Sequence, residues 1–439
     1  MKSETFVSRF IYNLLWPIGL VFFLPGYLRK MVRRGGYRKN FGQRLAIYSG
    51  DVIAGLSRHT ATWLHAVSVG EVNVALKLAN ALRALEPDLY CVLTTTTTTG
   101  FALANKNAPS WIQVLYAPLD YWPIMRRAFA VIRPARILLV EAEVWPNLVA
   151  FAHARRIPVA LVNARLSPRS EKKFRRFKFL VAPVFRLLDL VCVPELEDVE
   201  HWKALGISAD RIRVTGSIKF DPASVGPVAG VQSAGDDATK PLAEASTNGL
   251  EYPVLFGGST HRGEEEILAR VFLRLRRQFP TLRLFIAPRH VERLREIRAR
   301  LDSLHLRVAL TTQIGSQFGD ADCVILDTTG ELHRWYAVAT VVFIGKSLTA
   351  RGGQNPVEPI LAGKPVVFGP HMENFAALAT ALVSGQGALQ VRDFDSLERA
   401  MEELLRDEEF RRHLVENARR VLNQHRGAAE RTAALVHKL

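Results

Sequence analysis

The chain has 439 residues, of which 48% are hydrophobic and 23% are charged, and its formal net charge is +16. This length predicts two or three domains that each bury a core, and we expect two. Nine basic residues and one acidic residue in the first 50 positions supply half of the net charge. The sequence has no aromatic-interleaved recognition motif, zinc-ligand spacing or repeat, so its positive charge does not require nucleic acid as a partner.

An uncharged segment comes first, IYNLLWPIGLVFFLPGYL at residues 11–28. As a helix it would be roughly 27 Å long, close to the minimum that crosses a hydrocarbon core, although two prolines and two glycines weaken it. Cations follow it where a signal peptide would have a small-residue cleavage site, and they place the body of the protein in the cytoplasm. The sequence therefore predicts a membrane anchor at residues 1–30. Whether this segment spans the membrane, lies in its interface or forms a buried soluble helix remains open.

A second basic run lies at residues 165–178, where seven cations accompany a single acidic residue, Glu171. Such a run could face anionic lipid headgroups or a phosphorylated substrate. A solvated surface with no ligand is the alternative.

Segments that alternate between strand and helix character begin at about residue 60. ATWLHAV, LYCVLTTTT, ARILLV and IPVALVNA predict strands, and EVNVALKLANALRAL, GFALANKN and WPNLVAFAHARR predict helices between them. This alternation predicts a parallel sheet flanked by helices. We expect a Rossmann-like domain at residues 31–221. Residues 222–251 are rich in Ala, Gly, Ser and Pro and are predicted to form a linker.

The same alternation returns in the second half of the chain. PVLFGGST, LRLFIAPRH, DCVILDTTG, TVVFIGKS and KPVVFGP predict strands, each followed by a helical segment. They predict a second Rossmann-like domain at residues 252–439, whose last helix could pack back on the first domain. The predicted fold class is α/β, with two doubly wound domains and a ligand cleft at the carboxyl ends of facing strands.

Polar residues in the first half fall where predicted strands give way to helices, which is where this architecture binds ligands. Glu71 ends the motif SVGE in the first turn of a helix, where it is either a general base or a residue that favours the helix dipole. Glu141 and Glu143 follow ARILLV, so one could face the cleft while the other caps the next helix. Lys219, just before the predicted linker, could neutralise a phosphate.

Similar positions occur in the second half. Ser259 and Thr260 follow the first strand of that half, and Gly330 and Glu331 follow VILD. Arg289 ends the strand LRLFIAPRH, and its planar guanidinium could bind a phosphate or carboxylate with two hydrogen bonds. An ordinary ion pair is the alternative for Arg289.

The segment FIGKSLTARGGQNPVEPILAGKPVVFGP has the layout of a nucleotide-binding loop. Gly352 and Gly353 let the backbone approach a ligand, and Pro356 suits the first position of a helix whose end presents unpaired N–H groups. Glu358 would repel a phosphate but could accept hydrogen bonds from two ribose hydroxyls. A capped helix without a ligand is the alternative.

The sequence predicts neither a metal site nor a cofactor. It has no Walker loop and no G-x-S-x-G elbow. Cys91, Cys192 and Cys323 lie far apart in apolar runs and are predicted to be reduced core thiols. Asp320 and Asp322 look like a pair of metal ligands, but they precede a strand and are therefore predicted to be structural.

Eight motifs resemble those of one family in order and spacing, over nearly the whole chain. They are WLHAVSVGEV, EAEVWPNL, VNARLSPRS, VTGSIKFD, GGSTHRGEEE, APRH, DTTGEL and GGQNPVEP. The family is the 3-deoxy-D-manno-octulosonic acid (Kdo) transferases of lipopolysaccharide synthesis. The resemblance implies a GT-B glycosyltransferase on the cytoplasmic face of the inner membrane. It would move Kdo from CMP-Kdo to lipid IVA, a lipid A precursor, with inversion and without a metal.

The resemblance also implies roles for individual residues. Glu71 would deprotonate the acceptor hydroxyl, while Glu141 and Lys219 would stabilise the transition state. The residues that would hold CMP are Pro288, Arg289, Thr329, Gly330, Glu331, Asn355, Pro356, Val357 and Glu358. Thr329 and Gln354 depart from the residues that the family commonly carries at these positions.

Two other functions remain open at this stage. A GT-B enzyme with a UDP-sugar donor would share the architecture and the acidic ribose contact. A non-enzymatic, membrane-tethered binder of anionic lipid or RNA would need only the basic surfaces, and replacing Glu71 would leave its function intact.

Overall fold

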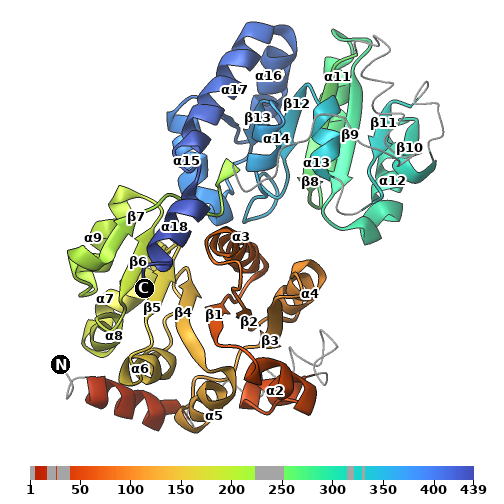
Figure 1. Cartoon of the computed structure of the whole chain (residues 1–439). Helices are drawn as coiled ribbons and strands as arrows, with labels where there is room; N and C mark the ends of the chain where they lie inside the picture. The colour runs from red at the N-terminus through yellow and green to blue at the C-terminus, as the bar shows by residue number, and fades with distance from the viewer. Residues whose placement is uncertain (1–4, 17–25, 27–39, 223–251, 314–320, 329–331) are drawn as a thin grey trace. The chain divides into compact units, whose positions relative to one another are not determined.

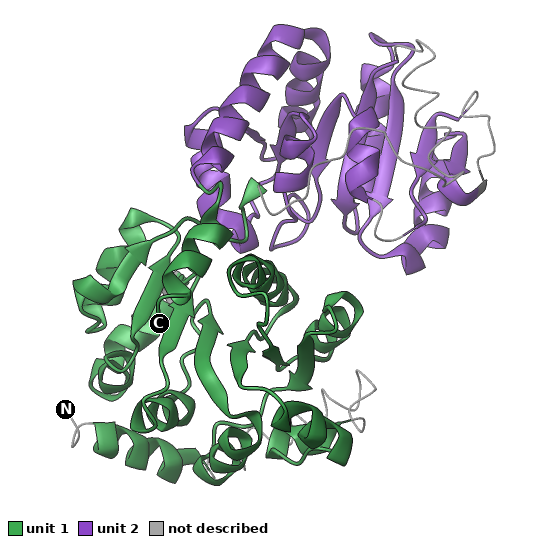
Figure 2. Ribbon diagram, in the orientation of Figure 1, with its two compact units in different colours: residues 1–224, 425–439 green, residues 225–424 purple. Residues whose placement is uncertain are grey.

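The computed structural model describes residues 5–16, 26, 40–222, 252–313, 321–328 and 332–439. The chain forms two compact units, one of residues 1–224 and 425–439 and the other of residues 225–424 (Figure 2). Most of the predicted anchor and nearly all of the predicted linker at residues 222–251 lie outside the described residues. Among the residues that are described, no helix is long and apolar enough to cross a membrane.

Unit 1 contains a parallel sheet of seven strands in the order β3-β2-β1-β4-β5-β6-β7 (Figure 1). The strands are β1 Ala61–His65, β2 Cys91–Thr95, β3 Ile112–Tyr116, β4 Pro134–Val140, β5 Val159–Val162, β6 Leu190–Val193 and β7 Ile212–Val214. β1, β2, β5 and β6 are buried at every position, as expected for a parallel sheet that is covered on both faces. The predicted parallel sheet is confirmed.

Helices cover both faces of this sheet. They are α2 Gly50–Ser57, α3 Val69–Leu85, α4 Thr98–Asn107, α5 Trp122–Ile132, α6 Pro146–Ala154, α7 Pro168–Arg176, α8 Lys178–Phe185, α9 Leu196–Ala204 and α18 Ala428–Val436. Trp63 packs on the face that α5, α6 and α9 cover, and its neighbour Leu64 packs under α3 and α18. This alternation follows from the two-residue period of a strand.

Unit 2 has the same architecture, with a parallel sheet in the order β10-β11-β9-β8-β12-β13-β14. The strands are β8 Val254–Thr260, β9 Arg283–Pro288, β10 Val308–Leu310, β11 Cys323–Ile325, β12 Val341–Ile344, β13 Val366–Phe368 and β14 Leu389–Gln390. The helices are α11 Glu264–Leu275, α12 Leu294–Asp302, α13 Leu332–Trp335, α14 Val357–Leu361, α15 Ala376–Ser384, α16 Phe394–Arg406 and α17 Glu408–Asn423. The five predicted strands correspond to β8, β9, β11, β12 and β13, and β10 and β14 extend the sheet at its edges.

The last residues of the chain belong to unit 1, where α18 packs against α3. The carboxylate of Asp221 accepts hydrogen bonds from the backbone N–H groups of Gly427 (3.0 Å) and Ala429 (2.9 Å). Arg431 donates through two guanidinium nitrogens to the carbonyl oxygen of Thr215, at 3.0 and 2.7 Å. The C-terminal helix therefore fixes the segment at residues 215–221, which contains Lys219.

Residues 5–16 form a helix that is held on unit 1 by polar contacts. The side-chain amides of Asn13 and Asn147 exchange two hydrogen bonds, at 2.9 and 3.0 Å. Trp16 stacks on Tyr121, with 5.2 Å between the ring centroids. Apolar side chains elsewhere on this helix are exposed, namely Phe6, Val7, Phe10, Leu14 and Leu15.

Asp322 has the structural role that the sequence predicts. Its carboxylate accepts hydrogen bonds from the Arg307 backbone N–H (2.9 Å), from the Arg307 guanidinium (3.0 and 3.1 Å) and from Arg276 (2.6 Å). Burial opposes ionisation, but the hydrogen bonds from Arg307 and Arg276 outweigh it and lower the pKa of Asp322 to about 2. Because the folded pKa lies below the usual aspartate value, this contribution to stability is full above about pH 4 and is lost as the pH falls toward 2.

We expect Asp322→Ala to lower the free energy of unfolding by about 1–3 kcal/mol at neutral pH, since charged hydrogen bonds are lost. Urea denaturation of the variant and the parent protein should show this difference, which shrinks as the pH is lowered from 4 toward 2. Asp395→Ala is the matched control, because Asp395 is exposed and its carboxylate forms a long ion pair of 3.7 Å with the Arg274 guanidinium. The control should change stability by less than about 0.5 kcal/mol.

Candidate active site

Glu71 lies in the first turn of α3, at the carboxyl end of β1. Its backbone N–H donates to the hydroxyl of the N-cap residue Ser68 (3.3 Å), and that hydroxyl donates to Glu71 Oε1 (2.7 Å). Glu71 Oε2 accepts from the backbone N–H of Val67 (2.8 Å). The carboxylate is 7% exposed. It is therefore held in one orientation by hydrogen bonds at the first turn of its own helix, where a carboxylate also favours the helix dipole, as the alternative interpretation predicts.

Glu141 and Asn163 directly follow the adjacent strands β4 and β5, and both have left-handed backbone conformations. Their φ angles are 61° and 51°. Non-glycine residues seldom adopt this conformation unless the surroundings impose it, and such residues concentrate at functional sites. The Glu141 N–H donates to the carbonyl of Val162 (3.0 Å), which fixes the turn beside the β5 end. The backbone therefore directs both residues to one edge of the sheet.

A cluster of charges forms where these strands end. Burial raises the pKa of Glu141, and the negative charge of Glu71 raises it further, while Lys219 and Arg165 lower it. Burial lowers the pKa of Lys219, with Glu141 and Glu71 acting in the opposite direction. The structure thus brings together all three residues predicted to be catalytic, Glu71, Glu141 and Lys219, and adds Arg165.

Asn163 supports Lys219 through the backbone. Its side-chain oxygen accepts hydrogen bonds from the Ile218 N–H (3.0 Å) and from the Ser217 hydroxyl (3.4 Å). Asn163 is only 3% exposed, so these contacts are shielded from water. Asn163 belongs to the motif VNARLSPRS, from which no role was predicted for it. Its position after a predicted strand is the signal that could have identified it.

Glu143 is partly buried near the same cluster. Burial raises its pKa to about 7, with further increases from Glu71 and Glu141 and a decrease from a hydrogen bond with Trp145. A carboxyl group with this pKa can hold or release a proton near neutral pH. The sequence analysis left open which of Glu141 and Glu143 is directed to the site, and both carry electrostatic interactions with Glu71.

His65 orients Trp145 next to Glu143. The indole N–H of Trp145 donates to His65 Nε2 (3.1 Å), and His65 Nδ1 lies 3.0 Å from the Thr94 hydroxyl. Burial lowers the pKa of His65 to about 4, so the ring is neutral and its proton is on Nδ1. The hydroxyl of Thr94 also accepts from the indole N–H of Trp63 (2.9 Å), so Thr94 makes structural contacts. Sequence reasoning missed His65 because it looked like an ordinary strand residue.

In unit 2, the predicted site residues at the carboxyl ends of β8 and β9 differ in their exposure to solvent: Ser259, Thr260 and Pro288 lie within the strands, and Arg289 directly follows β9. The Thr260 hydroxyl is buried and donates to Glu265 (3.1 Å), and Ser259 has a φ of 53°. Pro288 is buried at the end of β9, whereas Arg289 is exposed, and within the described part of the chain no carboxylate pairs with it. Anion binding by Arg289 stays a prediction.

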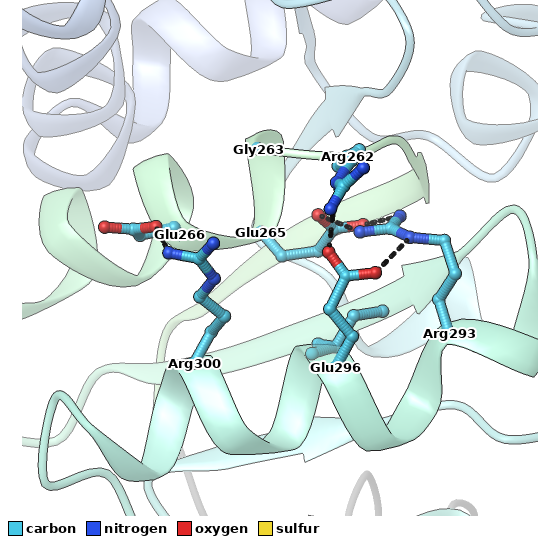
Figure 3. Close-up of a pocket in the computed structure, with 8 residues that line it drawn as sticks. Arg262, Gly263, Glu265, Glu266, Arg293, Glu296 and Arg300 are labelled. Carbon is cyan, nitrogen blue, oxygen red and sulfur yellow. Dashed lines mark hydrogen bonds and ion pairs between the residues drawn. The ribbon is translucent and has the colours of Figure 1, made fainter.

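A surface pocket of about 230 Å³ lies beside α11 and α12. Figure 3 shows that its charged side chains pair with one another: Arg293 with Glu265 and Glu296, Arg262 with Glu296, and Arg300 with Glu266. None of the residues predicted to bind substrate lines it. The charges of this pocket are therefore neutralised locally by ion pairs.

The predicted nucleotide loop follows β12. Gly352 and Gly353 have φ angles of 124° and 68°. The Gly352 N–H donates to Glu373 (2.6 Å), and the Gly353 N–H donates to the Lys346 carbonyl (2.9 Å). These glycines therefore form an internal turn with their N–H groups already bonded. Ligand binding by their backbone stays a prediction.

Asn355 and Glu358 are hydrogen-bonded to each other at the start of α14. The Asn355 side-chain oxygen accepts from the Val357 N–H (3.1 Å), and its amide donates to Glu358 Oε1 (3.2 Å). Pro356 is the N-cap of α14. Asn355 thus orients Glu358, a geometry that suits a carboxylate accepting from ribose hydroxyls. The other predicted CMP-binding residues, Thr329, Gly330 and Glu331, lie outside the described residues.

This arrangement in unit 1 can perform proton transfer. A fixed carboxylate lies near a second carboxylate and two cations, the combination needed to remove a proton from a hydroxyl while negative charge develops nearby. In unit 2, contacts of Arg289, Asn355 and Glu358 to the phosphate and sugar of a nucleotide stay a prediction. No group of three or more His, Cys, Asp or Glu residues able to hold a metal ion occurs among the described residues.

Comparison with known proteins identifies the family. A sequence model described as 3-Deoxy-D-manno-octulosonic-acid transferase (kdotransferase) matches residues 39–222. A 3-deoxy-D-manno-octulosonic acid transferase from Bordetella pertussis is 33% identical over 380 residues, which cover 84% of this chain and 85% of the relative. The chain belongs to the Kdo transferase family. Another Kdo transferase, from Haemophilus influenzae, is 29% identical over 407 residues and 92% of each chain.

Family membership confirms the resemblance carried by the eight motifs and makes the protein a glycosyltransferase that transfers Kdo. A solved structure of a glycosyltransferase from Rickettsia africae has a TM-score of 0.55 and 11% identity, and covers 87% of this chain and 98% of its own. At this identity the similarity concerns the fold alone. It supports the predicted GT-B-like α/β architecture for this Kdo transferase.

Proposed function

We propose that the protein transfers Kdo from CMP-Kdo to lipid IVA in lipopolysaccharide synthesis. The observation that carries the proposal is the cluster of Glu71, Glu141, Lys219 and Arg165 at the carboxyl ends of the unit 1 strands, in a chain that belongs to the Kdo transferase family. Lipid IVA is a disaccharide bisphosphate, and its phosphates suit the cations of the basic run at residues 165–178.

The proposed reaction is a single displacement with inversion. Glu71 takes the proton from an acceptor hydroxyl as that oxygen forms a bond to the anomeric carbon of Kdo. The bond between this carbon and the CMP phosphate oxygen breaks, and its electron pair leaves with CMP. Lys219 and Glu141 stabilise the charges that develop in the transition state.

The donor is proposed to bind unit 2. Arg289 meets the phosphate, and Glu358, oriented by Asn355, accepts from the ribose hydroxyls. Pro288, Val357 and residues 329–331 are assigned to the same site because they lie in the family motifs. CMP leaves with one phosphate, so side-chain cations are proposed to balance its charge without a divalent metal.

The test is incubation of the purified protein with lipid IVA and a CMP-Kdo generating system, followed by mass spectrometry. Transfer adds one or more Kdo residues to the mass of lipid IVA, and the number of increments gives the number of residues transferred. Absence of any increment would refute the acceptor and donor assignment. Parallel reactions with UDP-sugars test the competing donor class, since label transfer from UDP-sugars alone would favour that class.

We also propose that residues 1–30 attach the protein to the cytoplasmic face of the inner membrane. The exposed Phe6, Phe10 and Leu14 on the helix at residues 5–16 support this, because apolar side chains spaced along one helix can enter the interfacial layer of a bilayer. The nearby α7 and α8 add cations and the exposed Phe179, 71% accessible, which suit anionic lipid.

A double variant, Phe6→Ser with Phe10→Ser, should lower the fraction of protein that floats with anionic vesicles by about tenfold, since two apolar side chains no longer enter the interface. Flotation with vesicles of phosphatidylcholine and phosphatidylglycerol measures this. Leu439→Ser, at the exposed C-terminus, is the control and should not change flotation. Equal flotation of the double variant and the parent would contradict the role of these phenylalanines.

A further inference from the structure

Glu264 is a buried carboxylate in unit 2 that accepts four backbone hydrogen bonds. It begins α11 and has no exposed surface. One bond comes from the His261 N–H (2.8 Å) of its own turn. The other three come from consecutive residues beyond β12, the N–H groups of Lys346 (2.7 Å), Ser347 (3.0 Å) and Leu348 (3.0 Å). A buried charge is stable only with such compensation, so Glu264 and this loop depend on each other.

The three N–H groups form a backbone anion site that the protein fills itself. Lys346 has a φ of 56°, and successive N–H groups that converge after a left-handed residue make a concave site suited to phosphate or carboxylate. Because both oxygens of Glu264 occupy it, a nucleotide phosphate has no access to these N–H groups. The phosphate of a donor is then left to side chains such as Arg289.

The loop held by Glu264 is packed tightly to its neighbours. A Cβ on Gly345 would lie 2.2 Å from the carbonyl oxygen of Ser259, and one on Gly369 would lie 2.1 Å from that of Ser347. The Ser347 hydroxyl accepts from the Gly369 N–H (2.8 Å). Residues 345–348 therefore have little freedom once Glu264 is in place.

The same loop fixes the proposed donor residues. The Lys346 carbonyl accepts from the Gly353 N–H (2.9 Å), which closes the turn two residues before Asn355. Asn355 in turn orients Glu358. Hydrogen bonds at Lys346, Gly353 and Asn355, together with the chain from Gly353 to Asn355, thus connect Glu264 to the carboxylate proposed to bind ribose.

We propose that Glu264 is a positioning residue for the nucleotide donor, which holds residues 346–348 by occupying their anion site and so sets the place of Asn355 and Glu358. This inference rests on the proposed donor site in unit 2. Glu264 itself does not touch the donor. Glu264 belongs to the motif GGSTHRGEEE, from which no role was predicted for this glutamate.

The test compares Glu264→Gln and Glu264→Asp with Asp322→Ala in the full-length protein. An amide at position 264 turns one acceptor oxygen into a donor that opposes the loop N–H groups. We expect the KM for CMP-Kdo to rise about tenfold or more in Glu264→Gln, with kcat at saturating donor within about threefold of the parent value. Calorimetric titration with CMP should show the same loss of affinity, and Glu264→Asp, which keeps the charge, should show a smaller rise.

Asp322→Ala is the matched control, because it removes another buried carboxylate of unit 2, at the amino end of β11, that also accepts a backbone N–H. It should lower stability and leave the KM for CMP-Kdo within about twofold. If both Glu264 variants lower stability and leave the donor KM unchanged, Glu264 is only structural and the inference is wrong. If Glu264→Gln does not fold, the test uses Glu264→Asp alone. An unchanged KM for CMP-Kdo in that variant would then show that the inference is wrong. A parent protein without turnover on CMP-Kdo contradicts the proposed function instead.

Discussion

Replacing Glu71 with Gln is expected to lower kcat for Kdo transfer by about 10²–10⁴-fold, the usual contribution of a general base. Glutamine keeps the size of the side chain and can still accept from the Val67 N–H and bond the Ser68 hydroxyl, so α3 retains its cap. Stability should therefore change by no more than about 1 kcal/mol. Initial rates at saturating donor and acceptor, together with urea denaturation, measure the two effects separately.

The control for the capping role of Glu71 is Asp393→Ala. Asp393 is the N-cap of α16, accepts from the Ser396 N–H (2.9 Å) and lies outside the proposed site. Its loss should cost about 1 kcal/mol of stability without changing kcat. If Glu71→Gln keeps kcat within tenfold of the parent value, Glu71 serves only as a helix cap and another group must accept the proton.

Replacing Lys219 with Met should lower kcat by about 10²–10³-fold, since a buried cation that opposes developing negative charge is removed. The variant should also change the pH profile. Lys219 lowers the pKa of Glu141, so its removal raises that pKa further above the usual range. Glu141 is then protonated at a higher pH, and the acid limb of the kcat profile moves to higher pH. Rates measured between pH 5 and 9 would show both changes.

Lys219→Arg should restore part of the rate because it keeps the charge, although its planar group differs in shape. Lys203→Met is the control, since Lys203 is exposed on α9 and pairs with Glu200 at 2.7 Å. It should alter neither kcat nor the profile. A Lys219→Met enzyme with the parent rate and an unmoved acid limb would remove Lys219 from the mechanism.

Glu71 shows how far local sequence reasoning reaches. The motif SVGE predicted a carboxylate in the first turn of a helix, either as a general base or as a residue that favours the helix dipole. The structure places Glu71 in the first turn of α3 and adds hydrogen bonds to the residues just before it. The two roles are compatible, because hydrogen bonds from Val67 and Ser68 hold the carboxylate in a fixed orientation. Local patterns identify this first turn of the helix. They do not show that Glu141, which follows β4, and Lys219, which lies after β7, are near Glu71.

The predicted nucleotide-binding loop shows what local sequence reasoning cannot predict. Its glycines were predicted to admit a ligand, but a Cβ on Gly353 would lie 2.5 Å from the Met372 sulfur, and one on Gly352 would lie 2.9 Å from the Asn374 amide nitrogen. Positive φ angles and these close contacts explain both glycines within the fold. The sequence could not reveal this, since Met372 and Asn374 follow β13 and lie beside the two glycines only in the folded chain.

The sequence by itself determined the alternating strands and helices, the division into two α/β halves and the family motifs, because apolar periodicity and strand-end residues are local properties of the chain. Tertiary structure alone decided which side chains act together. Asn163 supports the Lys219 segment, α18 binds Asp221 from more than 200 residues away, and Glu264 fills the anion site of residues 346–348. These contacts join distant segments whose approach depends on the order of strands in each sheet, which no local period encodes.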